Sequence, residues 1–377
     1  ADVTPPGGAP SMSVDEVRPT HPLQGSEATV LLSSGDKVLH SEHHFTSAQG
    51  LRIACQSFEP PRGAPPANAG VLLIHGFNTH AGYSFASFDY TYAGSVLQRY
   101  VDAGLAAHTV DLQGFGKSGG YKGLRAHVRR VGDLVADVLQ LCGILKERQP
   151  GLPLFLHGQC FGGAIATLAA ASAPPGLLRG AVLTVPNIAL AEEAVPSKAV
   201  VAALGCVAAL APALPILSEP EDSDAAFQFR FEADPFCYAG AVRASWCDQL
   251  RRMYDAFQTP GALEGVRLPF VCFQSVRDDF CSPQGSYALY ERAESTDKVL
   301  YEVANMGHAV LTEDGCGDVI ALVLEWVKAR AAKGEEAFRG KRRERLVVQK
   351  AARPALGFAG AATVALWKER ARTAGRE

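Results

Sequence analysis

A cysteine between two glycines is the sequence feature best suited to chemistry. Residues 154–164 read LFLHGQCFGGA: an apolar run, a glycine-rich turn and a helix start. This is the Gly-x-nucleophile-x-Gly pattern of a nucleophile elbow, with Cys160 at the reactive position. Gly158 and Gly162 would prevent backbone clashes at such a turn, and the helix N-terminus would lower the thiol pKa. Gly-x-Cys-x-Gly alone favours a buried turn cysteine, but the flanking strand and helix favour a nucleophile.

A second strand-like run predicts an oxyanion-binding loop. Residues 71–77 read VLLIHGF, and a strand ending in His-Gly upstream of an elbow suits a loop whose backbone N–H faces an oxyanion. We expect the N–H groups of Phe77 and Phe161 to be the two donors, and His75 to be structural. The run DLQGFGKS at 111–118 is interpreted as a glycine-rich turn, because it lacks the spacing of a phosphate-binding loop.

An acid and a histidine are expected further along the chain, each after a C-terminal strand. Asp278 and Asp279 both follow the apolar run 270–274, and spacing alone does not separate them. His308 follows the run 299–303. In a Cys–His–Asp arrangement, His308 would take the thiol proton while the carboxylate orients and stabilises the imidazolium.

The rest of the chain predicts the sheet that these residues need. Short apolar runs alternate with amphipathic stretches, which favours an α/β fold: a mostly parallel central sheet with helices on both faces. Residues 41–60 predict two short strands joined at Gln49–Gly50. The expected strands are 71–75, 107–111, 154–157, 181–185, 270–274 and 299–303, and the expected helices are 89–103, 124–147, 161–171, 283–293 and 314–332.

The pattern predicts a core with one insertion and two extensions. Proline, glycine, serine and threonine dominate the N-terminal stretch, and a long segment of mostly helical or irregular sequence interrupts the alternation of strands and helices. The expected parts are an irregular N-terminal arm (1–40), an α/β core (41–185 and 268–331), an inserted cap or lid (186–267) and a basic C-terminal extension (332–377).

The cap contains a run, 199–217, without any charged residue. Its length would suit a membrane span. Its alanines, Gly205 and the prolines at 212 and 215, together with its place between two core strands, favour a lid helix over a pocket.

Composition limits the classes of function. The chain has 377 residues, 47% hydrophobic and 20% charged, as in ordinary globular proteins. Its net charge of −3 is uneven, because residues 331–377 carry 12 basic and 5 acidic side chains whereas residues 1–330 carry 24 and 34. Such an acidic body argues against nucleic acid as a partner.

The cysteines and the N-terminus suggest a location. Nine cysteines, an odd number without Cys-x-x-Cys spacing, predict a reducing, intracellular compartment and no structural zinc site. We expect no other metal and no cofactor. The chain begins at Ala1 without an apolar signal segment. The missing initiator methionine suggests that an organellar targeting peptide was removed, although an artificially shortened chain would begin in the same way.

Taken together, these motifs resemble the monoacylglycerol lipase and lysophospholipase branch of the α/β-hydrolase superfamily, in its plant-type, serine-aminopeptidase-like form. The resemblance runs from about Ser41 to Arg330. It implies an α/β-hydrolase fold and an acyl-lipid or other small ester as substrate. The matching segments are HFTSAQGLRI (the family's hairpin), VLLIHGF (its oxyanion loop), VDLQGFGKSGG (DxxGxGxSxG), HGQCFGGA (HGxSxGGA) and NMGHAV (its histidine loop).

The resemblance also implies which acid is used. In the family the aspartate lies five positions before a proline, so Pro283 selects Asp278 over Asp279. Within the cap, ADPFCYAG resembles the family's Asp-Pro-x-x-Tyr-x-Gly motif, at Asp234, Pro235, Tyr238 and Gly240.

Two departures from the family pattern stand out. Gln274-Ser275 replaces the usual His-Gly before the acid, which we interpret as a structural change, and Cys160 replaces the nucleophilic serine. With a working cysteine, the intermediate is an acyl-Cys160 thioester. The protein would then be an ester hydrolase or an acyltransferase, since related dienelactone hydrolases and polyhydroxyalkanoate synthases resemble it in using cysteine.

Two other accounts of Cys160 stay open. The cysteine was exchanged for a native serine, or the site is impaired and the protein is a scaffold or subunit of a larger, membrane-associated complex. The retained oxyanion loop, elbow glycines, acid and histidine favour the enzyme.

The C-terminal extension lies outside the resemblance. It contains a basic cluster at 339–345 and an apolar run at 355–367 that is too short to span a bilayer. An interfacial or partner-binding helix and a solvated helix are both compatible with it. A membrane surface or a protein partner, bound through the cap and the tail, is therefore expected beside the small ester substrate.

Overall fold

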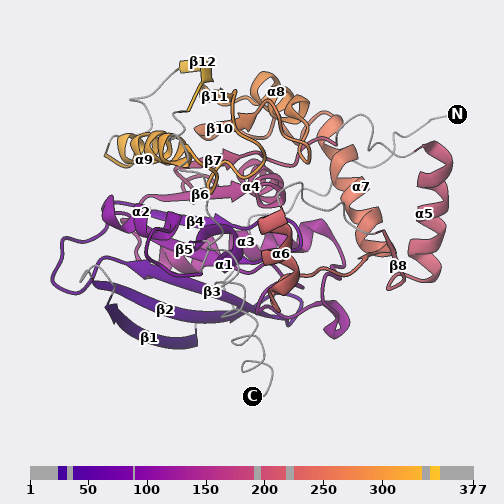
Figure 1. Cartoon of the computed structure of the whole chain (residues 1–377), viewed down its shortest axis with the longest axis horizontal. Coiled ribbons are helices and arrows are strands. Elements are labelled where there is room, and N and C mark those ends of the chain that lie inside the picture. The colour runs from indigo at the N-terminus through magenta and orange to yellow at the C-terminus, as the bar shows by residue number, and fades with distance from the viewer. Residues whose placement is uncertain are drawn as a thin grey trace, which may run out of the picture.

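The central feature of the fold is a large twisted sheet. The structure, a computed structural model, describes residues 24–31, 37–87, 90–190, 197–217, 225–332 and 340–348. Within these residues a ten-stranded sheet has the order β1-β2-β3-β5-β4-β6-β7-β10-β11-β12 (Figure 1). Pairing is antiparallel from β1 to β5 and parallel from β5 to β12, so the predicted mostly parallel sheet is confirmed. The strands are β1 (Gln24–Leu31), β2 (Lys37–Thr46), β3 (Arg52–Glu59), β4 (Gly70–Ile74), β5 (Ala106–Val110), β6 (Leu154–Gln159), β7 (Gly180–Thr184), β10 (Phe270–Ser275), β11 (Asp297–Val303) and β12 (Gly340–Leu346).

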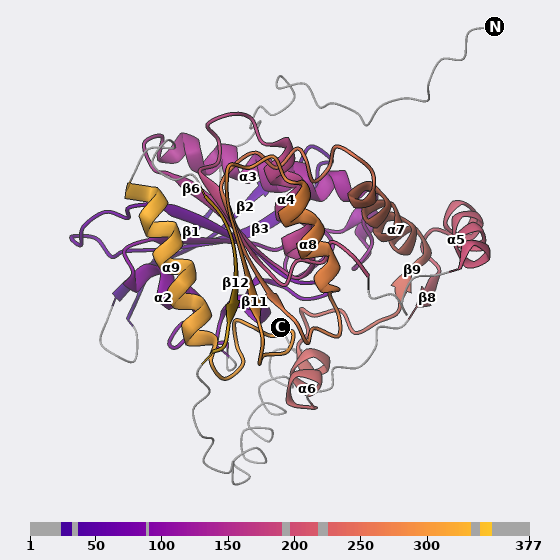
Figure 2. The same cartoon turned by 90° about the horizontal axis from the view of Figure 1, so that it is seen from above.

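Helices cover both faces of this sheet (Figure 2). On one face lie α2 (Val96–Asp102) and α9 (Cys316–Ala332). On the other lie α3 (Val131–Arg148), α4 (Phe161–Ser172) and α8 (Pro283–Arg292).

Strand β4 shows why the central strands are continuous apolar runs. Val71 and Leu73 belong to the hydrophobic core beneath α2 and α9, whereas Leu72 and Ile74 belong to the core beneath α3 and α4. All residues of β4 are buried. A strand covered on both faces has no solvent-facing side, so its sequence does not alternate.

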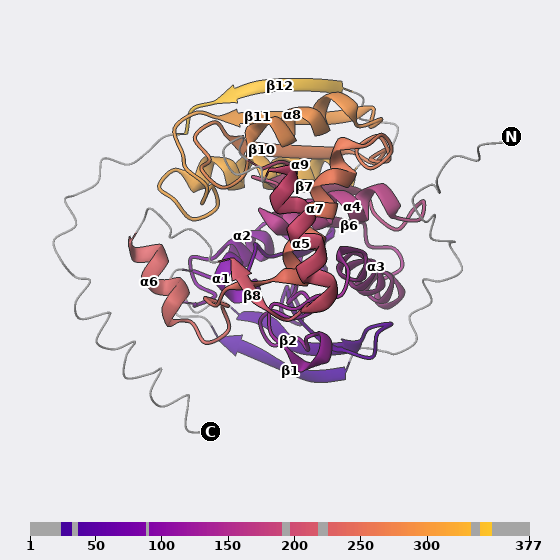
Figure 3. The same ribbon diagram turned by 90° about the vertical axis from the view of Figure 1, so that its right-hand side faces the viewer.

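Five further elements lie between β7 and β10, outside the large sheet. They are α5 (Lys198–Leu210), β8 (Pro215–Leu217), α6 (Ala225–Ala233), β9 (Val242–Arg243) and α7 (Ala244–Gln258). α7 packs against α5 and also contacts α3. Figure 3 views the molecule from the side on which α5 and α7 lie, with β1 and β12 at opposite edges of the sheet.

The uncharged run of the cap forms a shorter helix than expected. α5 ends at Leu210, shortly before Pro212, and β8 follows as an exposed strand paired with β9. Proline lacks the N–H that would continue the helix. None of the helices in the described residues has both the length and the apolar character needed to cross a membrane.

Two core helices also begin later than predicted. α2 begins at Val96 because the Ser95 side chain accepts a hydrogen bond from the Gln98 N–H and caps the helix there. α3 begins at Val131, where Asp133 occupies the first turn. Apolar periodicity extends past such ends, so it locates helix boundaries poorly.

The two edge strands of the sheet, β1 and β12, come from the segments that were predicted to be N- and C-terminal extensions. The prediction of an irregular arm over 1–40 is wrong for 24–31 and 37–40, which form β1 and the start of β2. The polar sequence of β1 suits an edge strand and carries little apolar signal. At the opposite edge, the basic residues 340–346 form β12 against β11, where Arg343 pairs with Glu302. The apolar run 355–367 lies outside the described residues.

Candidate active site

Cys160 occupies a strained turn between β6 and α4. Its backbone has φ 53° and ψ −119°, a left-handed conformation that is uncommon for any residue except glycine. A Cβ on Gly158 would lie 2.3 Å from the Gly162 carbonyl oxygen, and one on Gly162 would lie 2.1 Å from the Ile74 carbonyl oxygen. Both predicted elbow glycines are therefore required sterically. Helix α4 begins at the residue that follows Cys160.

The structure brings Asp278 and His308 together from two different loops. Asp278 follows β10 and His308 follows β11. The His308 Nδ1 lies 2.9 Å and 3.0 Å from the two carboxylate oxygens of Asp278, whose side chain is fully buried. The N–H groups of Phe280 and Cys281 also donate to Asp278. Asp279 is exposed, so Asp278 is the residue that orients the imidazole.

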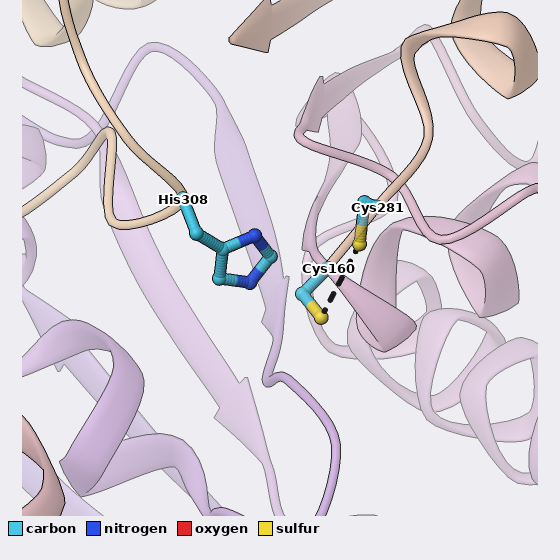
Figure 4. A group of neighbouring side chains, drawn as sticks. All are labelled: Cys160, Cys281 and His308. Carbon is cyan, nitrogen blue, oxygen red and sulfur yellow. Dashed lines mark hydrogen bonds between the residues drawn. The ribbon is translucent and has the colours of Figure 1, made fainter. Parts of the chain in front are cut away.

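A second cysteine, which the sequence analysis missed, lies beside Cys160. The sulfur atoms of Cys160 and Cys281 are 3.8 Å apart. Figure 4 shows the His308 ring and the Cys281 side chain on either side of Cys160. Ligating atoms of the three residues lie within 4.8 Å of one another. The available signal was the place of Cys281 in the loop of the predicted acid, three positions after Asp278.

The charges of this cluster favour a thiolate beside an imidazolium. The Cys281 hydrogen bond, aided by the charge of His308, holds the pKa of the Cys160 thiol well below its ordinary value although burial opposes this. Burial acts to lower the pKa of His308, but the Cys160 charge and the Asp278 hydrogen bond raise it well above its usual range. Burial raises the pKa of Cys281, which remains a thiol and donates to Cys160.

Alkylation by iodoacetamide is expected to show this lowered pKa. Because only the thiolate reacts, Cys160 should react at full rate above its lowered pKa and lose reactivity as the pH falls through it. The midpoint should lie below the reference thiol value of about 8.5, and His308→Gln should move it upward. The measurement is carbamidomethylation of the tryptic peptide 149–179, with the exposed Cys206 as an internal control for the reagent. A midpoint at the reference value in the unaltered protein would contradict the ion pair.

The two predicted oxyanion donors lie next to Cys160. Phe161 is the first residue of α4, and a Cβ on Gly76, the residue before Phe77, would be 3.5 Å from the Cys160 Cβ. Among the described residues, neither the Phe77 nor the Phe161 N–H donates to a backbone or side-chain acceptor. The two phenyl rings pack 5.7 Å apart, and both contact the ring of Trp246 from α7. Both amides are therefore available to an oxyanion.

His75 has the structural role that was predicted. It is fully buried, its Nδ1 donates to the Gly76 carbonyl at 2.8 Å, and its Nε2 accepts from the Leu112 N–H at 2.9 Å. Burial lowers its pKa to about 4. The neutral ring therefore ties the oxyanion loop to the loop after β5.

Gln274 and Ser275 also connect loops, in agreement with their structural interpretation. The Gln274 amide donates to the carbonyls of Ser275 and Cys281 and accepts from the Ser286 hydroxyl. The Ser275 hydroxyl donates to the Met306 carbonyl at 2.7 Å. The Gln274 bonds hold the loop of the acid to itself and to α8, and the Ser275 bond holds it against the loop of the histidine.

The cap motif holds the cap segment to the oxyanion loop. The His80 Nε2 and an Asp234 carboxylate oxygen are 2.9 Å apart, and the Tyr238 N–H donates to the Asn78 carbonyl at 2.8 Å. Burial acts to raise the pKa of Asp234, but hydrogen bonds from His80 and other donors lower it to about 2. Two residues of the motif therefore bind the chain just after Phe77.

Two clusters in the described residues have donor atoms close enough for a metal ion. One is Cys160, Cys281 and His308; the other is His80, Asp234 and Cys237. In each, the histidine is already hydrogen-bonded to a carboxylate.

Comparisons with known proteins identify the family of this chain. Residues 65–315 match the family described as serine aminopeptidase, S33. The chain is 29% identical to a monoacylglycerol lipase of Mycolicibacterium smegmatis over 76% of this chain and 96% of that protein. It is 30% identical to the human monoglyceride lipase over 77% of this chain and 91% of that protein. A soluble variant of the Saccharomyces cerevisiae monoglyceride lipase, solved with a substrate analogue, has the same fold, with a TM-score of 0.61 and 19% identity over 74% of this chain and 92% of that one. The chain therefore belongs to the serine aminopeptidase S33 family of α/β-hydrolases, and it resembles the monoacylglycerol lipases.

Proposed function

We propose that this protein is a carboxylic-ester hydrolase of the monoacylglycerol lipase type that works through an acyl-Cys160 intermediate. The observation that supports it most directly is the convergence of Cys160, His308 and Asp278 next to two unoccupied backbone N–H donors. A nucleophile, a proton carrier, its orienting carboxylate and an oxyanion site are the parts that acyl transfer needs.

The proposed reaction uses each of these groups at a stated atom. The Cys160 thiolate attacks the ester carbonyl carbon, and the N–H groups of Phe77 and Phe161 bind the oxyanion. The ester C–O bond then breaks, and His308 gives its Nε2 proton to the departing alkoxide. A water next loses a proton to His308 and attacks the thioester, which releases the carboxylic acid and regenerates the thiolate. Asp278 holds the Nδ1–H of His308 throughout.

A single-chain acyl ester is the substrate class that fits best. The relatives named monoacylglycerol lipase and monoglyceride lipase match 76% and 77% of this chain. Trp246 of the cap packs on the rings of Phe77 and Phe161, whose N–H groups are the proposed oxyanion donors, so the reacting atoms sit beside an apolar wall. Apolar walls suit acyl chains better than peptides or sugars.

The experiment that tests this proposal looks for the intermediate itself. Protein mixed with p-nitrophenyl decanoate should release p-nitrophenol, and rapid acid quenching should trap a decanoyl group on the tryptic peptide 149–179, whose single cysteine is Cys160. Prior treatment with iodoacetamide should abolish both signals. An adduct without turnover would favour transfer to an acceptor other than water, and neither adduct nor turnover would favour the scaffold instead.

We also propose that the cap meets a membrane surface. Several apolar side chains of α5 and β8 are exposed, among them Leu210 at 87% and Leu217 at 57%. The substrate of a monoacylglycerol-type hydrolase resides in lipid, and exposed apolar side chains gain free energy by inserting there. This proposal gives the protein a peripheral position at a membrane. The nine unpaired cysteines support the separate proposal of a reducing compartment.

Vesicle binding is expected to depend on these cap residues. Leu210→Asp combined with Leu217→Asp should weaken co-sedimentation with phosphatidylcholine–phosphatidylserine vesicles at least about tenfold, because burying one leucine side chain contributes about 1.5–3 kcal/mol. Val347→Asp is the matched control, since Val347 is 63% exposed just after β12. A chain ending at Val348 tests the tail without removing β12. Equal binding by the cap variant and the control would contradict the proposal.

A further inference from the structure

Two cysteines lie side by side at the site, although ester hydrolysis needs only one. Cys160 lies at the elbow and Cys281 in the loop after β10, yet their sulfur atoms are in van der Waals contact at 3.8 Å. Cys281 is fully buried, whereas 9% of the surface of Cys160 remains exposed. Thiol oxidation depends on thiolate character, on access and on a second thiol poised beside the first.

We propose that the Cys160–Cys281 pair is a site of reversible oxidation, at which a hydroperoxide converts the two thiols into a disulfide. The ligand class is a small organic or inorganic hydroperoxide. Formation of this disulfide does not depend on acylation of Cys160, whereas its effect on ester hydrolysis rests on the function proposed above.

The geometry suits formation of this bond. A disulfide has sulfur atoms about 2.05 Å apart, so the present 3.8 Å separation must close by less than about 2 Å. The turn at Cys160 is tightly confined by Gly158 and Gly162, which leaves the Cys281 side chain and its loop to supply most of the movement. A change of side-chain torsion moves a sulfur atom by this amount.

The chemical steps balance with the groups present. The Cys160 thiolate attacks the terminal peroxide oxygen, so an S–O bond forms, the O–O bond breaks and the departing alkoxide takes the proton of the His308 imidazolium. The sulfur is oxidised and the peroxide is reduced to an alcohol. The Cys281 sulfur then attacks the sulfenic sulfur, so the S–S bond forms and the S–O bond breaks. Hydroxide leaves with the Cys281 proton as water. Two thiols and one organic hydroperoxide thus become one disulfide, one alcohol and one water. With hydrogen peroxide the departing hydroxide takes the place of the alkoxide, so the products are one disulfide and two waters.

The disulfide has two consequences for the site. It occupies the sulfur that attacks the ester, so hydrolysis stops while it is present. It also removes the sulfenic acid before a second hydroperoxide can carry it to the irreversible sulfinic acid. A dithiol reverses the bond by thiol–disulfide exchange, which returns both cysteines.

Peptide mapping tests the inference without any measurement of turnover. The full-length protein is treated with tert-butyl hydroperoxide or hydrogen peroxide, blocked with iodoacetamide and digested with trypsin without reduction. Cys160 and Cys281 are the single cysteines of peptides 149–179 and 278–292. We expect these two peptides to appear cross-linked, at their summed mass less two hydrogen atoms, and to separate again after dithiothreitol.

Two variants test whether Cys281 is the cysteine that pairs with Cys160. In Cys281→Ser, hydroperoxide should leave peptide 149–179 heavier by two oxygen atoms, in a form that dithiothreitol does not restore. Cys206→Ser removes an exposed cysteine of α5 and should leave the cross-link unchanged. Unreacted thiols in the treated wild-type protein, or a sulfinic Cys160 beside a free Cys281, would overturn the inference.

These readouts separate this inference from the proposed function. A protein that forms the cross-link but never releases p-nitrophenol keeps the oxidation site and loses the hydrolase. A protein that hydrolyses esters but forms no cross-link does the opposite.

Discussion

Cys160→Ala is expected to lower kcat/KM for p-nitrophenyl decanoate by at least about 10⁴-fold. The variant loses the sulfur that attacks the acyl carbon, and removal of a nucleophile from a triad costs about as much as removal of the whole triad. The small alanine methyl group also fits the elbow, whose backbone already carries a side chain at φ 53°. The measurement is initial-rate hydrolysis by protein whose circular dichroism matches the wild type.

Two comparisons make the Cys160 result specific. Cys206→Ala changes an exposed cysteine of the cap and should leave the rate unchanged. Cys160→Ser should retain esterase activity but resist iodoacetamide, because an alcohol needs His308 as a general base and is not alkylated by that reagent. If Cys160→Ala keeps its hydrolytic rate, the covalent route is excluded.

Gly162→Ala is expected to lower the free energy of unfolding by about 3 kcal/mol or more. It should also abolish the alkylation of Cys160 at pH values below the ordinary thiol pKa. The new methyl group would lie 2.1 Å from the Ile74 carbonyl oxygen and 2.5 Å from that of His75. Both are backbone atoms at the end of β4, so relief requires a shift of α4 or of the oxyanion loop. Urea denaturation measures the loss of unfolding free energy.

Gly143→Ala is the matched control for the elbow glycine. Gly143 lies inside α3, and a Cβ there would meet no atom within 4 Å. Since alanine favours a helix over glycine by about 1 kcal/mol, this variant should be neutral or more stable than the wild type. Equal stability of Gly162→Ala and Gly143→Ala would mean that α4 moves away from β4 at no cost.

Local sequence patterns were sufficient to predict the central strands of the sheet and the nucleophile elbow. Strands such as β4 and β6 are buried on both faces and leave continuous apolar runs that are visible without neighbours. The elbow is equally local, because the two glycines, the nucleophile and the helix start lie within a few residues. The parallel order of the strands then implied that their carboxyl ends, with the loops of Asp278 and His308, meet at one edge.

Other features depend on partners that are distant in the chain. β12 is a run of basic residues that becomes a strand only because β11 offers it an unpaired edge. Spacing left Asp278 and Asp279 equivalent, and the resemblance alone selected between them. The folded loop buries one carboxylate against His308 and exposes the other.

Cys160 could be predicted from the local sequence, whereas the position of Cys281 beside it depends on the tertiary structure. The residue type, backbone strain and helix dipole of the elbow are properties of a short stretch of sequence, and they predict Cys160 as the nucleophile. The thiol that tunes Cys160 lies 121 residues away, in a loop with no motif of its own. Only the packing of β10 beside β7 and β6, which brings their carboxyl ends together, places one sulfur against the other. Side-chain proximity across a sheet depends on strand order, and strand order is a property of the whole chain.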